Sequence, residues 1–420
     1  MAQYDLITVG GGIGGSALAT VMARAGHKVL VLERSEAFED QVRGEWIAPW
    51  GVVETRRLGL YDALIAAGGH HLDRHVTYDA VVSPDVAEEV ALPLNMFVPG
   101  VPGPLCIGHP KHCQTLIEAA AAAGATVLRG VEVEIVSPGD DPSVTFVSGG
   151  VRQVAQARML VGADGRASAV REACGIVLHA DKPHHMFAGM LVDNVPGWDE
   201  RTQAIGTEDE FNFLVFPQGE GRARVYGSFP IEARHRFSGP EGQKTFLEAF
   251  RARCSPRNAM IADGRPAGPL RSYFNHDSWT DLPFAEGAVL VGDAAGWNDP
   301  IIGLGLSITY RDVRIVSDLL LGSDDWGPSL LAPYGEERFE RMRRLRFVAG
   351  LTSALDAEFG ERAEARRADF FTRAQSDPSL RSHAFAIMGG PETAPPAIFT
   401  AAYRAKVLGA DQPLGTESPA

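Results

Sequence analysis

The sequence predicts an α/β fold, α+β overall, in which a parallel-sheet domain is interleaved with an antiparallel-sheet domain and followed by a helical C-terminal region. Three observations support this prediction. A glycine-rich strand-turn-helix opens the chain, two later segments run from an apolar strand into Gly-Asp, and the stretches between them alternate apolar and polar residues. With 420 residues, of which 45% are hydrophobic, the chain can bury the core of such a multi-domain fold.

The first element is a βαβ unit. Residues 4–9 form an apolar run of strand length, residues 16–24 are good helix formers, and residues 28–32 form a second strand that leads into Glu33. The turn between strand and helix has the G-x-G-x-x-G spacing, with its glycines at Gly10, Gly12 and Gly15. The first glycine permits a tight turn, the second lets the backbone approach a pyrophosphate, and the third lets helix and strand pack closely. An acid at the end of the second strand accepts hydrogen bonds from ribose hydroxyls, which favours FAD or NAD over NADP.

Two further segments repeat the plan of a strand followed by Gly and Asp. Residues 157–172 contain Asp164 between two glycines, and residues 287–312 contain Asp293 followed by a glycine-rich loop and a helix. Taken singly, each is compatible with an ordinary turn, because Asp and Gly are common there. Together, and in this order after the first unit, they are hard to obtain by chance.

At this point the chain resembles the FAD-dependent class A monooxygenases typified by aromatic hydroxylases, together with their relatives the flavin-dependent halogenases and geranylgeranyl-type reductases. The resemblance rests on three signatures, GGGIGG with Glu33 and Arg34, GADGRASAVR, and GDAAGWNDPIIGLG, which spread over most of the chain. It implies a Rossmann-like FAD-binding domain, FAD as cofactor, and NADH or NADPH as a transient electron donor. It also implies oxygenation of an aromatic or electron-rich small molecule by O₂ through a flavin C4a-hydroperoxide.

Carried over position by position, the resemblance implies that Glu33 binds the FAD ribose, that Asp293 accepts from a ribityl hydroxyl, and that Asp164 serves both FAD and the passing nicotinamide nucleotide. Arg43 matches a loop arginine that approaches the flavin, although a surface arginine is the alternative. His109 stands where the family usually has arginine, and a structural neighbour is the alternative for it too. The complete set of expected cofactor contacts is Gly10, Gly12, Ile13, Gly14, Gly15, Glu33, Arg34, Arg43, His109, Val133, Asp164, Asp293, Pro300, Gly303, Gly305 and Leu306.

The chain departs from the hydroxylase pattern in ways that leave three reactions open. Gly296 stands where hydroxylases carry a larger polar residue, and a glycine at this position is more typical of the reductases. Asp299-Pro300 and the stretch RGEW resemble the halogenases, but the W-x-W-x-I-P signature is absent and no lysine is assignable as a halide relay. A reductase, a halogenase and a non-enzymatic flavin-binding protein therefore remain as alternatives, and no catalytic side chain is assigned.

The domain boundaries follow the change in pattern along the chain. We expect a discontinuous FAD-binding domain at 1–70, 106–180 and 281–330, a substrate-binding sheet domain at 71–105 and 181–280, and a helical C-terminal region at 331–420. Aromatic residues alternate along the expected strands of the second domain, as at Phe211, Phe213 and Phe216. From them we predict that Phe213, together with Trp297 in the third signature, lines a substrate pocket; core packing is the alternative for each.

Composition excludes some partners. A net charge of −14 argues against nucleic acid, which requires a basic face. The N-terminus lacks the basic stretch of a secretory signal, and the glycine-broken apolar run at 6–23 predicts a strand-turn-helix and no transmembrane segment. The four cysteines lack the spacing of a zinc site, so no metal and a cytoplasmic location are expected. Homo-oligomerisation is left open.

Overall fold

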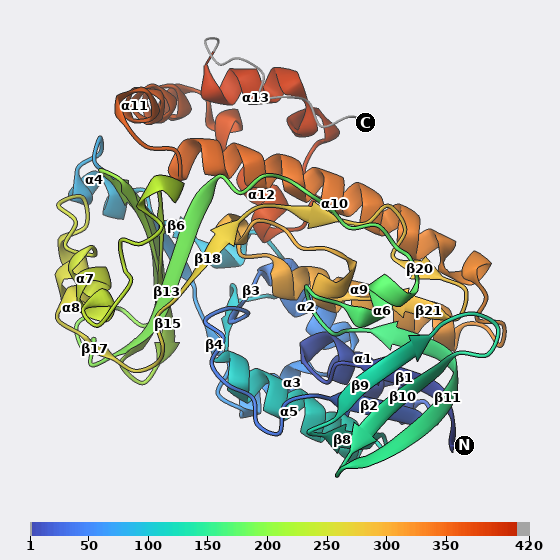
Figure 1. Ribbon diagram of the computed structural model, residues 1–420. Helices are drawn as coiled ribbons and strands as arrows, with labels where there is room; N and C mark the ends of the chain where they lie inside the picture. Colours follow the sequence, from blue (N-terminus) through green and yellow to red (C-terminus); the bar gives the residue numbers. More distant parts are fainter. Residues whose placement is uncertain (1, 410–420) are drawn as a thin grey trace.

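The computed structural model describes residues 2–409, so the last eleven residues of the expected C-terminal region lie outside the described part. An eight-stranded sheet, a second eight-stranded sheet and a group of C-terminal helices make up the molecule (Figure 1). Within the described residues, no helix combines the length and the apolar character needed to cross a membrane.

The first sheet carries the glycine-rich segments. Its strand order is β20-β21-β11-β1-β2-β8, and β1 pairs in parallel with both β2 and β11. An antiparallel meander, β9-β10-β11, extends it. The strands are β1 (Ala2–Val9), β2 (Val29–Glu33), β8 (Thr126–Arg129), β9 (Glu132–Ser137), β10 (Ser143–Ser148), β11 (Val151–Gly162), β20 (Phe284–Ala285) and β21 (Ala288–Leu290).

Both faces of this sheet are covered, which explains why its central strands are apolar at every position. Alternate residues such as Leu6 and Val31 pack against the long helices, while Ile7 and Leu30 pack against the meander and α6. The covering helices are α1 (Ile13–Arg24), α2 (Pro49–Arg57), α3 (Tyr61–Ala66), α5 (His109–Ala122), α6 (Ala169–Ala173) and α9 (Gly305–Leu321).

The second sheet is mainly antiparallel and lies beside the first (Figure 1). Its order is β17-β13-β16-β15-β14-β5-β6, with β18 paired to β13. The strands are β5 (Arg74–Asp79), β6 (Leu92–Pro93), β13 (His185–Asp193), β14 (Thr202–Glu208), β15 (Phe211–Gly219), β16 (Arg222–Phe229), β17 (Arg265–Pro266) and β18 (Arg271–Asn275). The helices α4 (Pro84–Glu89), α7 (Gly242–Glu248) and α8 (Ala259–Ala262) belong to this part.

Smaller ladders join these parts: β3 (Trp46–Ile47), β4 (His70–His71) and β7 (Leu105–Cys106) form one, and β12 (His179–Ala180) and β19 (Ser278–Trp279) form another.

The C-terminal helices connect the two sheets. Figure 1 shows α10 (Pro328–Asp356) running along the top of the molecule above both sheets, with α11 (Glu361–Ser376) and α13 (Ala401–Leu408) on its outer side and α12 (His383–Met388) beneath it. Because α10 starts beside α9 and ends near β14, the backbone of its last turn accepts a hydrogen bond from the second sheet. The second sheet, α9 and these helices enclose a cavity.

Candidate functional site

The turn between β1 and α1 is held in place by two glycines and left open at a third. Gly10 has φ +97°, and a Cβ there would lie 2.3 Å from the carbonyl oxygen of Ala163. A Cβ on Gly15 would lie 1.9 Å from the carbonyl oxygen of Gly10, so helix and strand pack too closely for any side chain. By contrast, a Cβ on Gly12 would meet no atom of residues 2–409 within 4 Å. Gly12 is also the N-cap of α1 and provides no side-chain cap, which leaves the first N–H groups of the helix open to a ligand.

Glu33 ties the end of β2 to this turn. Its side chain is buried, one carboxylate oxygen accepts from the N–H of Gly11 at 2.7 Å, and the other accepts from the N–H of Ser35 at 2.7 Å. Each oxygen retains a further lone pair for a hydroxyl donor. Arg34, the next residue, is exposed.

Asp293 lies in the short 3₁₀ turn after β21, and about one third of its side chain is exposed. Arg166, from the second glycine-aspartate segment, donates to its carboxylate at 3.2 Å. Asp164 instead caps α6: one oxygen accepts from the N–H of Ala169 at 2.7 Å, and the other is buried without a partner among the described residues. Burial raises the pKa of Asp164 above its usual value.

The N-terminus of α9 opens onto the cavity in the same way as that of α1. The helix starts at Gly305, its N-cap Leu304 offers no side-chain acceptor, and a Cβ on Gly305 would meet nothing within 4 Å. Just before it, Gly303 adopts φ +66° and lies against the ring of Trp46. The positive end of this helix dipole therefore faces open space, where it stabilises negative charge.

Arg43 and His109 lie on the same cavity wall. The Arg43 guanidinium is 5.7 Å from the centre of the Tyr273 ring. His109 is the first residue of α5, and its Nδ1 is buried with no partner within residues 2–409. Burial, and then the charge of Arg43, lower the pKa of His109 below 6.5, so the ring is neutral at pH 7.

The cavity has a volume of about 560 Å³ and gathers residues from all three glycine-rich segments. Gly10, Gly12, Gly15, Glu33 and Asp164 lie outside its lining. The predicted residues that line it are Ile13, Gly14, Arg43, His109, Asp293, Trp297, Pro300, Gly303, Gly305 and Leu306. Val133 lies on β9, where it packs against the hydrophobic cluster on the meander side of the first sheet.

The prediction that Phe213 lines the pocket is wrong. Asn212, Leu214 and Phe216 of β15 face the cavity, whereas Phe213 is fully buried on the opposite face, against Phe250. The reason is that neighbouring strand residues point to opposite faces, and both faces of this sheet are covered with aromatic side chains. Trp297 does line the cavity, with the Arg166 guanidinium 4.8 Å from the centre of its ring.

Gly296 and Asp299, which left the reaction open, have structural explanations. Gly296 adopts φ +106°, and a Cβ there would lie 2.5 Å from the carbonyl oxygen of Ser278, so the backbone requires glycine. Asp299 is 1% exposed and caps the turn at Pro300 by accepting from the N–H of Ile301 at 2.9 Å. Neither residue lines the cavity.

Asp299 belongs to a buried polar cluster behind this turn. Its carboxylate lies 3.3 Å from Nε2 of His184 and 3.7 Å from Nε2 of His185, and it accepts from Asn275 at 3.1 Å. Burial, and then the charge of Asp277, raise the pKa of Asp299 to about 8. At neutral pH this acid is therefore mostly protonated.

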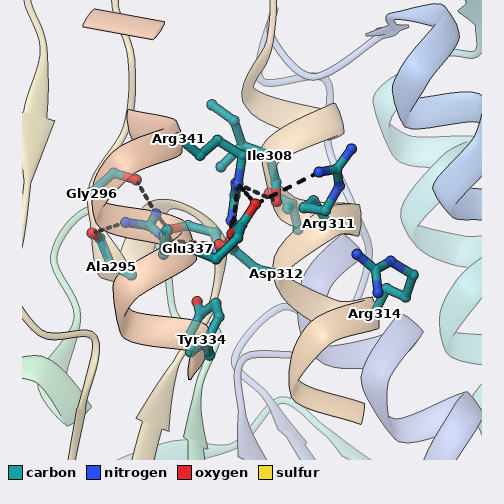
Figure 2. Close-up of polar contacts among 12 residues, drawn as sticks. Ala295, Gly296, Ile308, Arg311, Asp312, Arg314, Tyr334, Glu337 and Arg341 are labelled. Carbon is teal, nitrogen blue, oxygen red and sulfur yellow. Dashed lines mark hydrogen bonds and ion pairs between the residues drawn. The ribbon is translucent and has the colours of Figure 1, made fainter. Parts of the chain in front are cut away.

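Arg338 of α10 holds the turn that follows Asp293 from behind, and Arg341 of the same helix pairs with Asp312 (Figure 2). The Arg338 guanidinium donates to the carbonyl oxygens of Ala295 at 2.8 Å and Gly296 at 3.0 Å. Asp312 of α9, fully buried, pairs with Arg338 at 3.1 Å and with Arg341 at 2.7 Å. The small-residue loop is thus fixed by charged groups outside the cavity, which leaves its cavity face free.

The sequence did not indicate the far part of the cavity. Thr352, Asp356 and Phe371 from the C-terminal helices line it together with Asn212 from the second sheet, and His75 and Gln203 of the same sheet also line the cavity. These residues carry no motif, and only the path of α10 over the sheet brings them together. The alternation of β14 would have been the one local signal for Gln203.

Comparison with known proteins supports the nucleotide site. A family described as "FAD binding domain" matches residues 3–346. The chain is 26% identical over 335 residues to squalene monooxygenase of Rattus norvegicus, covering 75% of this chain and 54% of that protein, so it spans about half the length of this relative. It is 28% identical over 353 residues to 3-demethoxyubiquinol 3-hydroxylase of Escherichia coli, covering 81% and 85%. The crystal structure of p-nitrophenol 4-monooxygenase from Pseudomonas putida shares the fold, with a TM-score of 0.76 at 17% identity, covering 93% of this chain and 99% of that one.

Proposed function

The chain belongs to the FAD binding domain family, and from this premise we propose that it is an FAD-dependent monooxygenase that uses NADH or NADPH and oxygenates an aromatic or electron-rich small molecule. The observation that carries the proposal is the pair of helix N-termini, at Gly12 and Gly305, that lack side-chain caps and have open space where a Cβ would stand. One suits a pyrophosphate and the other the electron-rich end of a flavin ring.

The residues present fit FAD. Gly12 and the start of α1 would receive the pyrophosphate, Glu33 the ribose hydroxyls, and Asp293 the ribityl chain. Pro300, Gly303 and the turn into α9 would lie against the ring, and Nδ1 of His109 remains available for a hydrogen bond. Bound FAD would accept a hydride from the nicotinamide nucleotide and, once reduced, activate O₂ for transfer of one oxygen atom to the substrate.

The protein's own contribution is positioning, electrostatics and exclusion of water. The α9 N-terminus stabilises negative charge at the ring without any reorganisation, because its N–H groups are already oriented. Phe216, Leu214 and Tyr226 of the second sheet give the opposite wall an apolar surface, which limits side reactions with water. The single G-x-G-x-x-G motif, assigned to FAD, favours a nicotinamide donor that binds transiently.

The cofactor assignment is tested by a matched pair of glycine variants. Gly12→Ala places a Cβ in the open space, so the apoprotein should keep its melting temperature while its FAD dissociation constant rises about tenfold or more. Gly15→Ala forces a contact with Gly10 and should melt earlier even without FAD. Unchanged FAD affinity in Gly12→Ala would place the cofactor elsewhere.

The reaction is tested on flavin-loaded protein. NADH or NADPH oxidation should consume O₂ and accelerate when a substrate is added. Turnover that continues without O₂ would identify a reductase instead, and a product that requires chloride or bromide would identify a halogenase. Packing explains Gly296 and Asp299 without either of these reactions, so the stretch RGEW is the sequence feature that still favours the halogenase.

A further inference from the structure

The far part of the cavity, away from the helix N-termini, combines apolar walls with a small group of polar side chains. Leu355, Phe370 and Phe371 contribute apolar surface there. Thr352 and Asp356 lie one turn apart on α10, so both project from one face of the helix into the cavity. Asn212 of β15 lines the same cavity from the sheet side.

Each of these three side chains offers an acceptor that the protein does not use. The Asn212 amide group donates to the carbonyl oxygen of Gly206 at 3.2 Å and to the hydroxyl of Thr207 at 3.0 Å, which identifies its nitrogen. Its Oδ1 is then buried without a partner, as is Oγ1 of Thr352, as far as residues 2–409 are concerned. The Asp356 carboxylate forms no ion pair with any described residue. The nearby Arg367 pairs instead with Asp79 at 3.0 Å.

The three acceptors belong to one place. The hydroxyl of Thr207 accepts from Asn212 and donates to the backbone carbonyl of Asp356 at 3.0 Å, so it links strand and helix directly. Thr352 stands one helical turn before Asp356. Sheet and helix therefore converge on a single patch of unused oxygen atoms.

The charges around this patch do not balance. Asp79 and Asp356 are two carboxylates, and the cation beside them among residues 2–409 is Arg367, which is 2% exposed and paired with Asp79. Burial, and then the charge of Asp79, raise the pKa of Asp356 to about 7. Without a partner this carboxyl group is stabilised by taking up a proton, whereas a ligand that brings a positive charge stabilises its ionised form. Arg381, the other cation on this part of the wall, lies beside His383 on the α12 side.

We propose that Asn212, Thr352 and Asp356 form a binding site for a protonated amine, and that the substrate of the proposed oxygenation carries this amine at the end remote from the flavin. An ammonium group has three N–H donors and one charge, which match three acceptors and one unpaired carboxylate. The substrate part of this inference rests on the proposed function.

The distance along strand β14 of the second sheet indicates how long the substrate is. Gln203 lies at the flavin side, because its Oε1 accepts from Nε1 of Trp46 at 2.9 Å and Trp46 lies against Gly303. Thr207, four residues further along the same strand, marks the amine patch. At about 3.3 Å per residue the two ends are about 13 Å apart, so the substrate is an elongated molecule.

The test is isothermal titration of FAD-loaded protein at pH 8 with decylamine, decanol and decanoate, which share one chain and differ in the head group. Decylamine should bind about tenfold or more tightly than decanol. Asp356→Asn should lower decylamine affinity about tenfold and leave decanol within about twofold, and Thr352→Val should lower decylamine affinity by a smaller factor. Glu358→Gln, which removes the same charge two residues later from a side chain that is 52% exposed and paired with Arg366, is the matched control.

Three results would overturn the inference: equal affinity for decylamine and decanol, unchanged decylamine affinity in Asp356→Asn, or tightest binding of decanoate, which would assign the head group to Arg381. Melting curves of both cavity variants separate lost binding from lost folding. Flavin absorbance separates the two proposals, because protein that binds no FAD contradicts the proposed function, and the preference among head groups is then measured by the same titration on the protein without flavin.

Discussion

Asp312 is the residue whose replacement tests how the glycine-aspartate turn is held. Its buried carboxylate accepts from Arg341 (Figure 2). It also accepts from Arg338 and from the N–H of Gly292 at 2.9 Å. Asp312→Asn keeps the shape of the side chain but removes its charge. Arg341 retains Glu337 at 3.0 Å, whereas Arg338 is left with carbonyl acceptors only.

The size of the effect follows from the geometry. Removing one partner of a buried ion pair costs about 3–5 kcal/mol, and because Arg341 keeps a carboxylate we expect the lower end, about 3 kcal/mol. An unfolding entropy of about 2.1 cal/mol/K per residue over 420 residues amounts to about 0.9 kcal/mol/K, so the melting temperature should fall by about 3 °C. FAD affinity should fall as well, because Arg338 fixes the carbonyl groups of the turn behind Asp293.

Thermal melts of apoprotein and FAD titrations measure both effects. Asp318→Asn is the control, since it makes the same substitution on the same helix at a side chain that is 64% exposed and paired with Arg314. It should change stability by less than about 0.5 kcal/mol. If Asp312→Asn has the same melting temperature as this control, the carbonyl groups alone compensate the charge of Arg338, and the reasoning fails.

Three further predictions concern residues that line the site or lie close behind it. Glu33→Gln retains an acceptor for the N–H of Gly11 but loses the charge that strengthens ribose binding, so the FAD dissociation constant should rise about tenfold in a fluorescence titration; an unchanged constant would remove this assignment. Asp299 has a pKa of about 8, above its usual 3.8, so its favourable contribution to stability is complete below pH 4 and is lost as pH rises towards 8. The unfolding free energy of Asp299→Asn relative to the parent should therefore increase from pH 5 to pH 8, by at most about 1.4 kcal/mol per pH unit in urea titrations, and parallel curves would contradict the shift. Phe213→Leu should lower stability by about 1 kcal/mol without changing KM, whereas Phe216→Leu should change KM, because only Phe216 lines the cavity; steady-state kinetics with melting curves distinguish them.

The part of the site built from the three glycine-rich segments could be predicted because it depends on local sequence. A strand, a glycine-rich turn and a helix are specified by neighbouring residues, and the parallel sheet then brings their carboxyl ends to one edge. The residues of the three signatures follow from this geometry without knowledge of long-range contacts. Ile13 and Gly14 reach the cavity because Gly10 and Gly15 fix the backbone between them.

The substrate half depends on contacts between distant segments, which local patterns do not encode. Alternation along β15 defines two faces correctly, but the sequence contains no signal for which face is covered by α7 and which by the cavity. Phe213 and Phe216 lie on opposite faces of the strand, and the sequence does not indicate which of the two lines the cavity. In the structure Phe213 packs against Phe250, and Phe216 lines the cavity. Asp356 is less predictable still, because it reaches the sheet only at the end of a 29-residue helix.

This division also locates the determinants of the reaction. Gly296 and Asp299 lie within the third signature and suggested a reductase or a halogenase, yet one is required by a positive φ and the other is a buried cap of the following turn. Residues that hold the cofactor loop are constrained by the loop itself, so they discriminate weakly between reactions that share the cofactor. The residues that select one reaction over another must therefore lie on cavity walls outside this loop. In this chain those walls are the cavity faces of β14, β15 and α10, and their unused acceptors at Asn212 and Asp356 are where substrate selection is best sought.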